Sequence, residues 1–142
     1  MKCLSPISPT SQSRLLIFII LVNVDSIQII GGNIALKPVI KNFKNYPNPV
    51  LGTEDGVPTV VSLYHDHEPG ETSTHHNHDW EHQVFITRGS GVLWVDGEEY
   101  PVTMGDFVLV PPNSSHYFKN TGSSTLSRVT FNPLRSEAYL SR

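Results

Sequence analysis

Short segments in which apolar and polar residues alternate, separated by Gly, Pro and Asn, dominate this chain from residue 57 onward. The pattern predicts seven strands, at residues 59–65, 82–88, 91–95, 98–102, 107–110, 116–119 and 125–131. The pair Asp96-Gly97 predicts a tight type I′ hairpin between the third and fourth of them. From residue 37 onward only a short turn at 135–140 has a helical period. The sequence therefore predicts an all-β sandwich or barrel.

Length and composition narrow the choice of protein class. A chain of 142 residues can form one domain with a real core, and 38% hydrophobic residues with 11 Pro and 10 Gly suit a turn-rich β protein. The formal charge of −3 and the lack of a basic cluster give no reason to expect nucleic-acid binding. Cys3 is the only cysteine, which excludes an intramolecular disulfide.

The N-terminal region has a different composition from the rest of the chain. An apolar run from Leu15 to Val22 follows Lys2 and Arg14, but it is too short to span a membrane. Three interpretations are open: an export signal without an Ala-x-Ala cleavage site, a mis-assigned extension with the true start at Leu36, or a genuine N-terminal strand. We expect a cytoplasmic protein, or an exported one if residues 1–30 are a signal.

The division of the chain follows from these patterns. Residues 1–36 are the signal-like or mis-assigned extension, and residues 37–56, polar and rich in Pro, are an arm that packs across the barrel. We expect the β-barrel itself at 57–132 and a C-terminal tail at 133–142.

Histidines are concentrated just before the strand expected at 82–88. His76 and His78 form a His-x-His pair, and on an extended chain both rings lie on the same face, where they can chelate one ion. His82 begins the next strand and can close on the same ion. His75 is one position off this parity, so we expect it to face away, and the second pair, His65-x-His67, lacks the glycine spacing that supports the first.

Two motifs resemble those of the cupin superfamily. The first consists of Gly70, His76, His78, position 82 and Gly89, and the second of Gly105, Pro111, His116 and Asn120. Fifteen residues, 90–104, separate the motifs, as in compact single-domain members. Asn113 stands where the second motif has Gly, a mild change because Asn also tolerates positive φ. His82 stands where the first motif usually has Glu.

The resemblance implies a double-stranded β-helix, the cupin jelly-roll barrel, over roughly residues 57–132. It also implies a divalent transition metal, Mn, Fe, Zn, Ni or Cu, bound by His76, His78, His82 and His116. Without the carboxylate the ion keeps its full charge, which favours an anionic substrate oxygen. Glu81 cannot replace that carboxylate, because on a continuing strand it points to the opposite face from His82.

Strand parity predicts the surroundings of the metal. Val84, Ile86 and Arg88 share a face with His82, and Phe118 shares one with His116. Arg88 could hold a substrate carboxylate, although a place at the rim suits it better. Trp94, Tyr64 and Phe107 are expected in the core, and Trp80 either shields the site or lies on the outer surface.

The resemblance implies a range of activities without choosing among them. We expect an enzyme of dioxygenase, isomerase or lyase type that acts on a small anionic or enolisable molecule. The alternative is a non-catalytic cupin that binds or senses a small ligand. No residue is placed firmly enough to be named as the general base. Cupins commonly pair through edge strands, so we also expect a homodimer, with residues 38–50 as the arm.

Overall fold

The computed structural model describes residues 27–30, 33–36, 38–46 and 48–136. The strands are β1 (Ile27–Ile30), β2 (Asn33–Leu36), β3 (Val60–His67), β4 (His82–Arg88), β5 (Ser90–Val95), β6 (Glu98–Thr103), β7 (Phe107–Val110), β8 (His116–Lys119) and β9 (Leu126–Pro133). Three short 3₁₀ helices are η2 (Phe43–Asn45), η3 (Thr53–Asp55) and η4 (Leu134–Ser136). All seven strands predicted beyond residue 57 are present within two residues of their expected ends.

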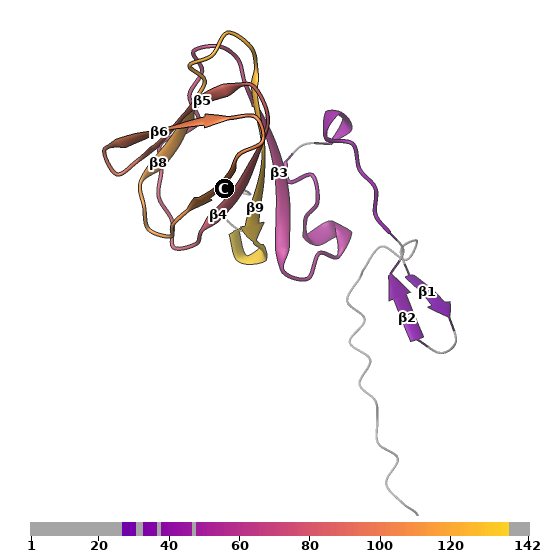
Figure 1. The fold of residues 1–142 in the computed structure, drawn as a ribbon. Coiled ribbons are helices and arrows are strands. Elements are labelled where there is room, and N and C mark those ends of the chain that lie inside the picture. The colour runs from indigo at the N-terminus through magenta and orange to yellow at the C-terminus, as the bar shows by residue number, and fades with distance from the viewer. Residues whose placement is uncertain (1–26, 31–32, 37, 47, 137–142) are drawn as a thin grey trace, which may run out of the picture.

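Two antiparallel sheets form the barrel (Figure 1). One has four strands in the order β3-β9-β4-β7, and the other has three in the order β6-β5-β8. Because strands that are distant in sequence pair within each sheet, the connections cross from one sheet to the other, as in a jelly roll. The predicted all-β jelly-roll barrel is confirmed.

The hydrophobic core lies between these sheets. Its buried apolar side chains come from both walls and include Val84, Ile86, Leu93, Val102, Val110, Phe118 and Leu126. Alternation along β4 buries His82, Val84 and Ile86 and leaves the residues between them less buried, as strand parity predicts. At the β5–β6 turn, Asp96 and Gly97 have φ values of 47° and 103°, which confirms the type I′ hairpin.

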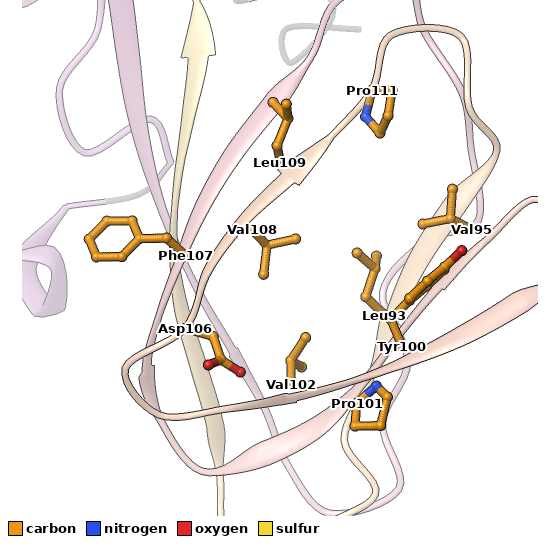
Figure 2. Close-up of a pocket in the computed structure, with 10 residues that line it drawn as sticks. All are labelled: Leu93, Val95, Tyr100, Pro101, Val102, Asp106, Phe107, Val108, Leu109 and Pro111. Atoms are coloured by element: carbon orange, nitrogen blue, oxygen red, sulfur yellow. The ribbon is translucent and has the colours of Figure 1, made fainter.

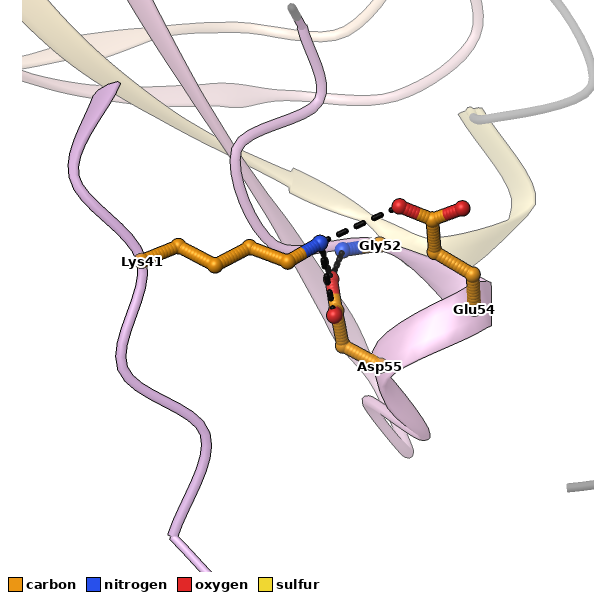
Figure 3. Close-up of polar contacts among 4 residues, drawn as sticks. All are labelled: Lys41, Gly52, Glu54 and Asp55. Atoms are coloured by element: carbon orange, nitrogen blue, oxygen red, sulfur yellow. Dashed lines mark hydrogen bonds and ion pairs between the residues drawn. The ribbon is translucent and has the colours of Figure 1, made fainter. Parts of the chain in front are cut away.

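Residues 41–46 and 48–55 lie along the outside of β3, where Val50 and Leu51 hydrogen-bond to Ser62. The Nζ atom of Lys41 lies 2.7 Å from Asp55 and 3.1 Å from Glu54, and Asp55 also accepts the N–H of Gly52 (Figure 3). The ring of Phe43 stacks on that of Tyr64 with centroids 3.7 Å apart. The contacts of Lys41 join the two ends of the segment, and the stacking of Phe43 on Tyr64 attaches the segment to β3.

Some sequence predictions fall partly or wholly outside the described residues. These include Cys3 and the apolar run from Leu15 to Val22, and of the turn expected at 135–140 only the start is described, as η4. The strands β1 and β2 pair with each other in a separate two-stranded sheet. Among the described residues, no helix has the length and apolar character needed to cross a membrane.

None of the three aromatic residues expected in the core belongs to it. Phe107 is 81% exposed, because it faces outward from β7 and stacks on Phe85 of β4. Trp94 and Tyr64 are partly buried instead, and Trp94 stacks on Tyr117. Sequence parity could not decide which face of β7 meets the core, because apolar residues occupy both faces of this strand.

Candidate metal centre

Backbone pairing brings the two histidine-bearing segments together. His76 and His116 exchange two backbone hydrogen bonds, of 2.9 and 3.2 Å, so the loop before β4 lies against β8. The carbonyl of His78 accepts the N–H of Asn113 at 2.6 Å. Asn113 has a φ of 66°, the left-handed conformation that the motif's usual Gly adopts without strain.

Four histidines converge at this junction. His76, His78, His82 and His116 each offer a ring nitrogen, and these atoms all lie within 4.8 Å of one another. The Nε2 atoms of His78 and His82 are 2.8 Å apart. Imidazole nitrogens bind Zn at about 2.0–2.1 Å, so small side-chain movements would bring all four to one ion. His76 is exposed and the other three are buried.

The other nitrogen of each ring is held by an oxygen. The Nδ1 atoms of His76, His78 and His116 lie 2.8 Å from the carbonyls of Thr74, Trp80 and Ser114. The Nδ1 of His82 donates to Oδ1 of Asn132. Because a carbonyl oxygen only accepts, each Nδ1 carries the hydrogen and each Nε2 keeps its lone pair.

The Nε2 lone pairs therefore point into a common space. Nε2 of His116 is buried and has no hydrogen-bond partner. Outer hydrogen bonds of this kind fix the orientation of metal-ligating histidines. The residues present thus fit a divalent transition metal bound through four Nε2 atoms.

Burial keeps the rings of His78, His82 and His116 neutral. It lowers the pKa of His78 to about 4 and that of His82 to about 3, and it also lowers the pKa of His116. A neutral imidazole is the form that binds a metal, so the buried ligands need not lose a proton at neutral pH.

The histidine and tryptophan next to these ligands have other roles. The Nε2 of His75 lies 2.8 Å from Oγ of Ser115, and its ring packs edge-on against Trp94, so it faces away as predicted. Trp80 is 5% exposed and lies parallel to the ring of His78 with centroids 4.0 Å apart. Of the two positions expected for Trp80, it takes the one that shields the site.

Two more motif positions have structural roles. Asn120 is fully buried, and its side-chain amide donates to the carbonyls of His67 and Ser124. Its Oδ1 accepts the N–H of Gly122. Gly89 has a φ of 75°, and a β-carbon there would collide with the backbone of Thr125. These residues hold the connections between the sheets that carry the histidines.

A cavity of about 410 Å³ adjoins the histidines. It is lined by Leu63, His65, His67, Thr72, Ser73, Thr74, His76, His82, Arg128, Thr130 and Asn132. This volume lies within the range of small-molecule sites. His65 and His67 line the cavity but do not belong to the four-histidine group, in line with the sequence prediction.

The arginine in this cavity is Arg128, not Arg88. The pairing of β4 with β9 shifts between Ile86 and Arg88, so two residues of β4 oppose one of β9. Such a bulge reverses the parity beyond it, and Arg88 is exposed. The suggestion that Arg88 shares a face with His82 is wrong for this reason, and its alternative place at the rim fits. Sequence reasoning missed Arg128, although it shares strand parity with buried Leu126.

A second cavity, of about 460 Å³, has a different character. Figure 2 shows it between β5, β6 and β7, where Val102 and Val108 point into it and Phe107 points away. Its lining is apolar apart from Asp106 and the hydroxyl of Tyr100, and it contains no histidine. The cavity beside the histidines is therefore the candidate functional site.

Comparison with known proteins agrees with the fold. Residues 63–131 match the cupin domain family. A curated relative, 5-nitrosalicylic acid 1,2-dioxygenase of Bradyrhizobium sp, is 30% identical over 90 residues, which cover 63% of this chain and 42% of the relative. An uncharacterised protein of Methanocaldococcus jannaschii is 30% identical over 56 residues, 39% of this chain and 45% of that protein. The chain thus spans less than half the length of the curated relatives it matches.

Two solved structures are similar to this chain in fold. A cupin 2 domain-containing protein from Halorhodospira halophila has a TM-score of 0.56 and 26% identity, and the match covers 59% of this chain and 60% of that one. The polyketide cyclase RemF from Streptomyces resistomycificus has a TM-score of 0.56 at 24% identity, with 61% and 62% covered. The second likeness concerns the fold alone.

Proposed function

This chain belongs to the cupin superfamily, and we propose that it is a metal-dependent dioxygenase that acts on a small anionic organic molecule. The observation that carries the proposal is the convergence of four Nε2 lone pairs beside a cavity of about 410 Å³. The similarity to 5-nitrosalicylic acid 1,2-dioxygenase supports the choice of reaction type.

The residues at the site would have separate roles. His76, His78, His82 and His116 hold the ion through Nε2, while Asn132 and the three backbone carbonyls keep each ring in the required tautomer. Such an ion supplies Lewis acidity toward a substrate oxygen and, if it is Fe or Mn, a route for electrons from the organic substrate to dioxygen. Trp80, which is 5% exposed and lies parallel to the ring of His78, would limit access of water from that side.

The exposure of His76 has a consequence for access. Three ligands are buried, whereas His76 lies on the exposed loop before β4 and also lines the cavity. A substrate would therefore reach the ion from the side of His76. The walls around His78 and His116 are closed by the core and by Trp80.

The test is oxygen uptake by protein reconstituted separately with Fe(II), Mn(II) and Zn(II). We expect uptake with 5-nitrosalicylate, 2-hydroxybenzoate or catechol and a product heavier by both atoms of O₂. His76→Ala should abolish it, whereas His75→Ala, one position away and outside the metal group, should keep it within about twofold. Stoichiometric metal with no turnover of any of these compounds would refute the dioxygenase and favour the ligand-binding alternative. Conversion of a substrate by the Zn-loaded protein without oxygen uptake would favour isomerase or lyase chemistry.

We also propose that the chain forms a homodimer through the outer face of β7. This strand is at the edge of its sheet, and its outward side chains Phe107 and Leu109 are 81% and 64% exposed. Phe131 of β9 lies near them on the same face, and an apolar groove of about 360 Å³ connects the three. An exposed edge with large apolar side chains is a typical interface between copies. The cytoplasmic location expected from the sequence stays a prediction.

A further inference from the structure

We propose that Arg128 binds the carboxylate of the ligand, so that the cavity takes a small organic carboxylate with its acid group at Arg128 and a second oxygen at the four histidines. The place of the second oxygen rests on the proposed function. The carboxylate site itself rests on the surroundings of Arg128.

Arg128 is a buried cation without an anion. Arg128 is 7% exposed. Within the described part of the chain, no carboxylate forms an ion pair with it. The Nη1 atom donates to Oγ1 of Thr130 at 2.6 Å, and the guanidinium carbon lies 4.5 Å from the centre of the Phe118 ring. The Nε atom is buried and has no hydrogen-bond partner.

Such an arrangement is costly in a protein that has no ligand for it. A buried charge is normally paired, because removal from water without a partner costs several kcal/mol. Burial lowers the pKa of Arg128 to about 10, so the guanidinium is still charged at neutral pH. The planar fork of an arginine matches the two oxygens of a carboxylate.

Two acidic residues, one on β3 and one in the loop after it, have other partners. Asp66 accepts a hydrogen bond from the hydroxyl of Ser127 at 2.6 Å, and it is exposed on the other side of the sheet. Glu71 accepts the N–H of Glu68 and is also exposed. Inside the cavity, the neighbours of Arg128 in the sheet are His65 and Ile86, neither of which carries a negative charge.

The position of Arg128 relative to the metal group sets the size of the ligand. Arg128, Thr130 and Asn132 are buried at alternate positions of β9, and Asn132 holds the ring of His82. Since a strand rises about 3.4 Å per residue, the Thr130 position, toward which the guanidinium extends, is about 7 Å from that of Asn132. One aromatic ring or a chain of similar length bridges that distance.

The opposing interpretation is that Arg128 is purely structural, held by Thr130 and the face of Phe118. The two interpretations differ in what Arg128→Met does to the ligand-free protein. If Arg128 is structural, its replacement removes stabilising contacts, and the melting temperature should fall. If Arg128 instead serves a ligand that is absent, Met fills the space without burying a charge. The melting temperature should then stay the same or rise.

The experiment measures binding by calorimetry on metal-loaded and metal-free protein. The probes are 4-hydroxybenzoate and 2-hydroxybenzoate, each paired with its neutral amide of the same shape. We expect the wild type to bind at least one acid about 10- to 100-fold more tightly than its amide, and Arg128→Met to lose this preference while keeping its metal. Arg128→Lys, which keeps the charge without the fork, should fall between them. Arg88→Met is the matched control and should leave the preference unchanged, since Arg88 is exposed outside the cavity.

Three results would overturn the inference: equal affinity for acid and amide in both pairs, a preference that survives in Arg128→Met, or a ligand-free Arg128→Met protein that melts at a lower temperature than wild type. Its failure is separable from that of the proposed function. A preference for carboxylates without oxygen uptake contradicts only the dioxygenase. Oxygen uptake at equal rates with acid and amide contradicts only the role of Arg128.

Discussion

The Nε2 atoms of His78 and His82 lie 2.8 Å apart, and each ring's Nδ1 is held by an oxygen acceptor. Two lone pairs at this separation repel each other unless a cation lies between or beside them. Burial makes the repulsion stronger, because little water is present to screen it. The metal-free protein therefore carries an unfavourable arrangement that an ion relieves.

Metal removal should lower stability. At a free metal concentration 1,000 times the dissociation constant, binding to the folded state alone contributes about 4 kcal/mol. Thermal melts before and after chelation, followed by re-addition of Fe(II), Mn(II) or Zn(II), measure this contribution. The His76→Ala protein serves as the control and should show little shift. An equal melting temperature for loaded and chelated wild type would contradict the account.

Asn132 should control metal affinity without touching the metal. Asn132→Leu removes the acceptor from Nδ1 of His82 and leaves that buried ring free to take the wrong tautomer. We expect metal affinity to fall about 10- to 100-fold, as for other outer partners of metal ligands. Asn132→Asp keeps an acceptor and should stay close to wild type. Competition titration with a chromophoric chelator measures both, and equal affinities for the two variants would disprove this role.

Substitutions at two glycines measure the cost of backbone strain separately from the cost of a steric collision. Gly70 and Gly89 both have positive φ, but a β-carbon at Gly70 meets nothing, whereas one at Gly89 collides with the backbone of Thr125. Gly70→Ala should cost about 1 kcal/mol in the free energy of unfolding. Gly89→Ala should cost about 1–3 kcal/mol more, since neighbouring backbone must move. Urea denaturation distinguishes these costs, and similar values for both variants would count against the packing described here.

His65 should make the metal-free protein sensitive to acid. Burial first, and then the charge of Arg128, lowers the pKa of His65 to about 3. The unfolded chain, with a pKa of about 6.5, binds more protons between these values, so stability is full above about pH 6.5 and declines toward pH 3. Between pH 7.5 and 4.5, His65→Gln should lose about 2 kcal/mol less than wild type. Identical pH profiles in urea denaturation would show that His65 titrates normally.

The outer face of β7 should determine the oligomeric state. Phe107→Ser combined with Leu109→Ser removes two exposed apolar side chains and should convert the expected dimer into a monomer, because less apolar area can be buried. Size-exclusion chromatography with light scattering gives the mass. Met104→Ser is the matched control, because Met104 is 65% exposed and lies outside both this face and residues 38–50. A monomeric wild type would end the dimer proposal.

The strands and the histidine group were accessible to sequence reasoning because both depend on local periodicity. Alternation located β4, β7 and β8, and the Asp96-Gly97 turn followed from the need for positive φ at two successive positions. The pair His76 and His78 was assigned to one ion, and the structure brings both into one group with His82 and His116. Whether that group binds an ion stays a prediction.

The residues that line the cavity were harder to predict from the sequence, because their positions depend on pairing between distant strands. The bulge after Ile86 turns Arg88 outward, and no residue within 82–88 indicates that a bulge forms there. Arg128 faces inward beside His65 and Ile86 only because β9 pairs with both β3 and β4. An arginine at the same parity as Leu126 was the available signal. Exposure of Phe107 likewise depends on which face of β7 meets the core.

The most direct test of the central claim is the metal content of native protein purified without chelator or affinity tag. Elemental analysis should find close to one divalent transition metal per chain in wild type and in His75→Ala, and much less in His76→Ala. His82→Glu, which restores the motif's usual carboxylate, should keep the metal. A wild-type protein that is free of metal, and that takes up none of Mn, Fe, Zn, Ni or Cu on titration, would contradict the four-histidine site.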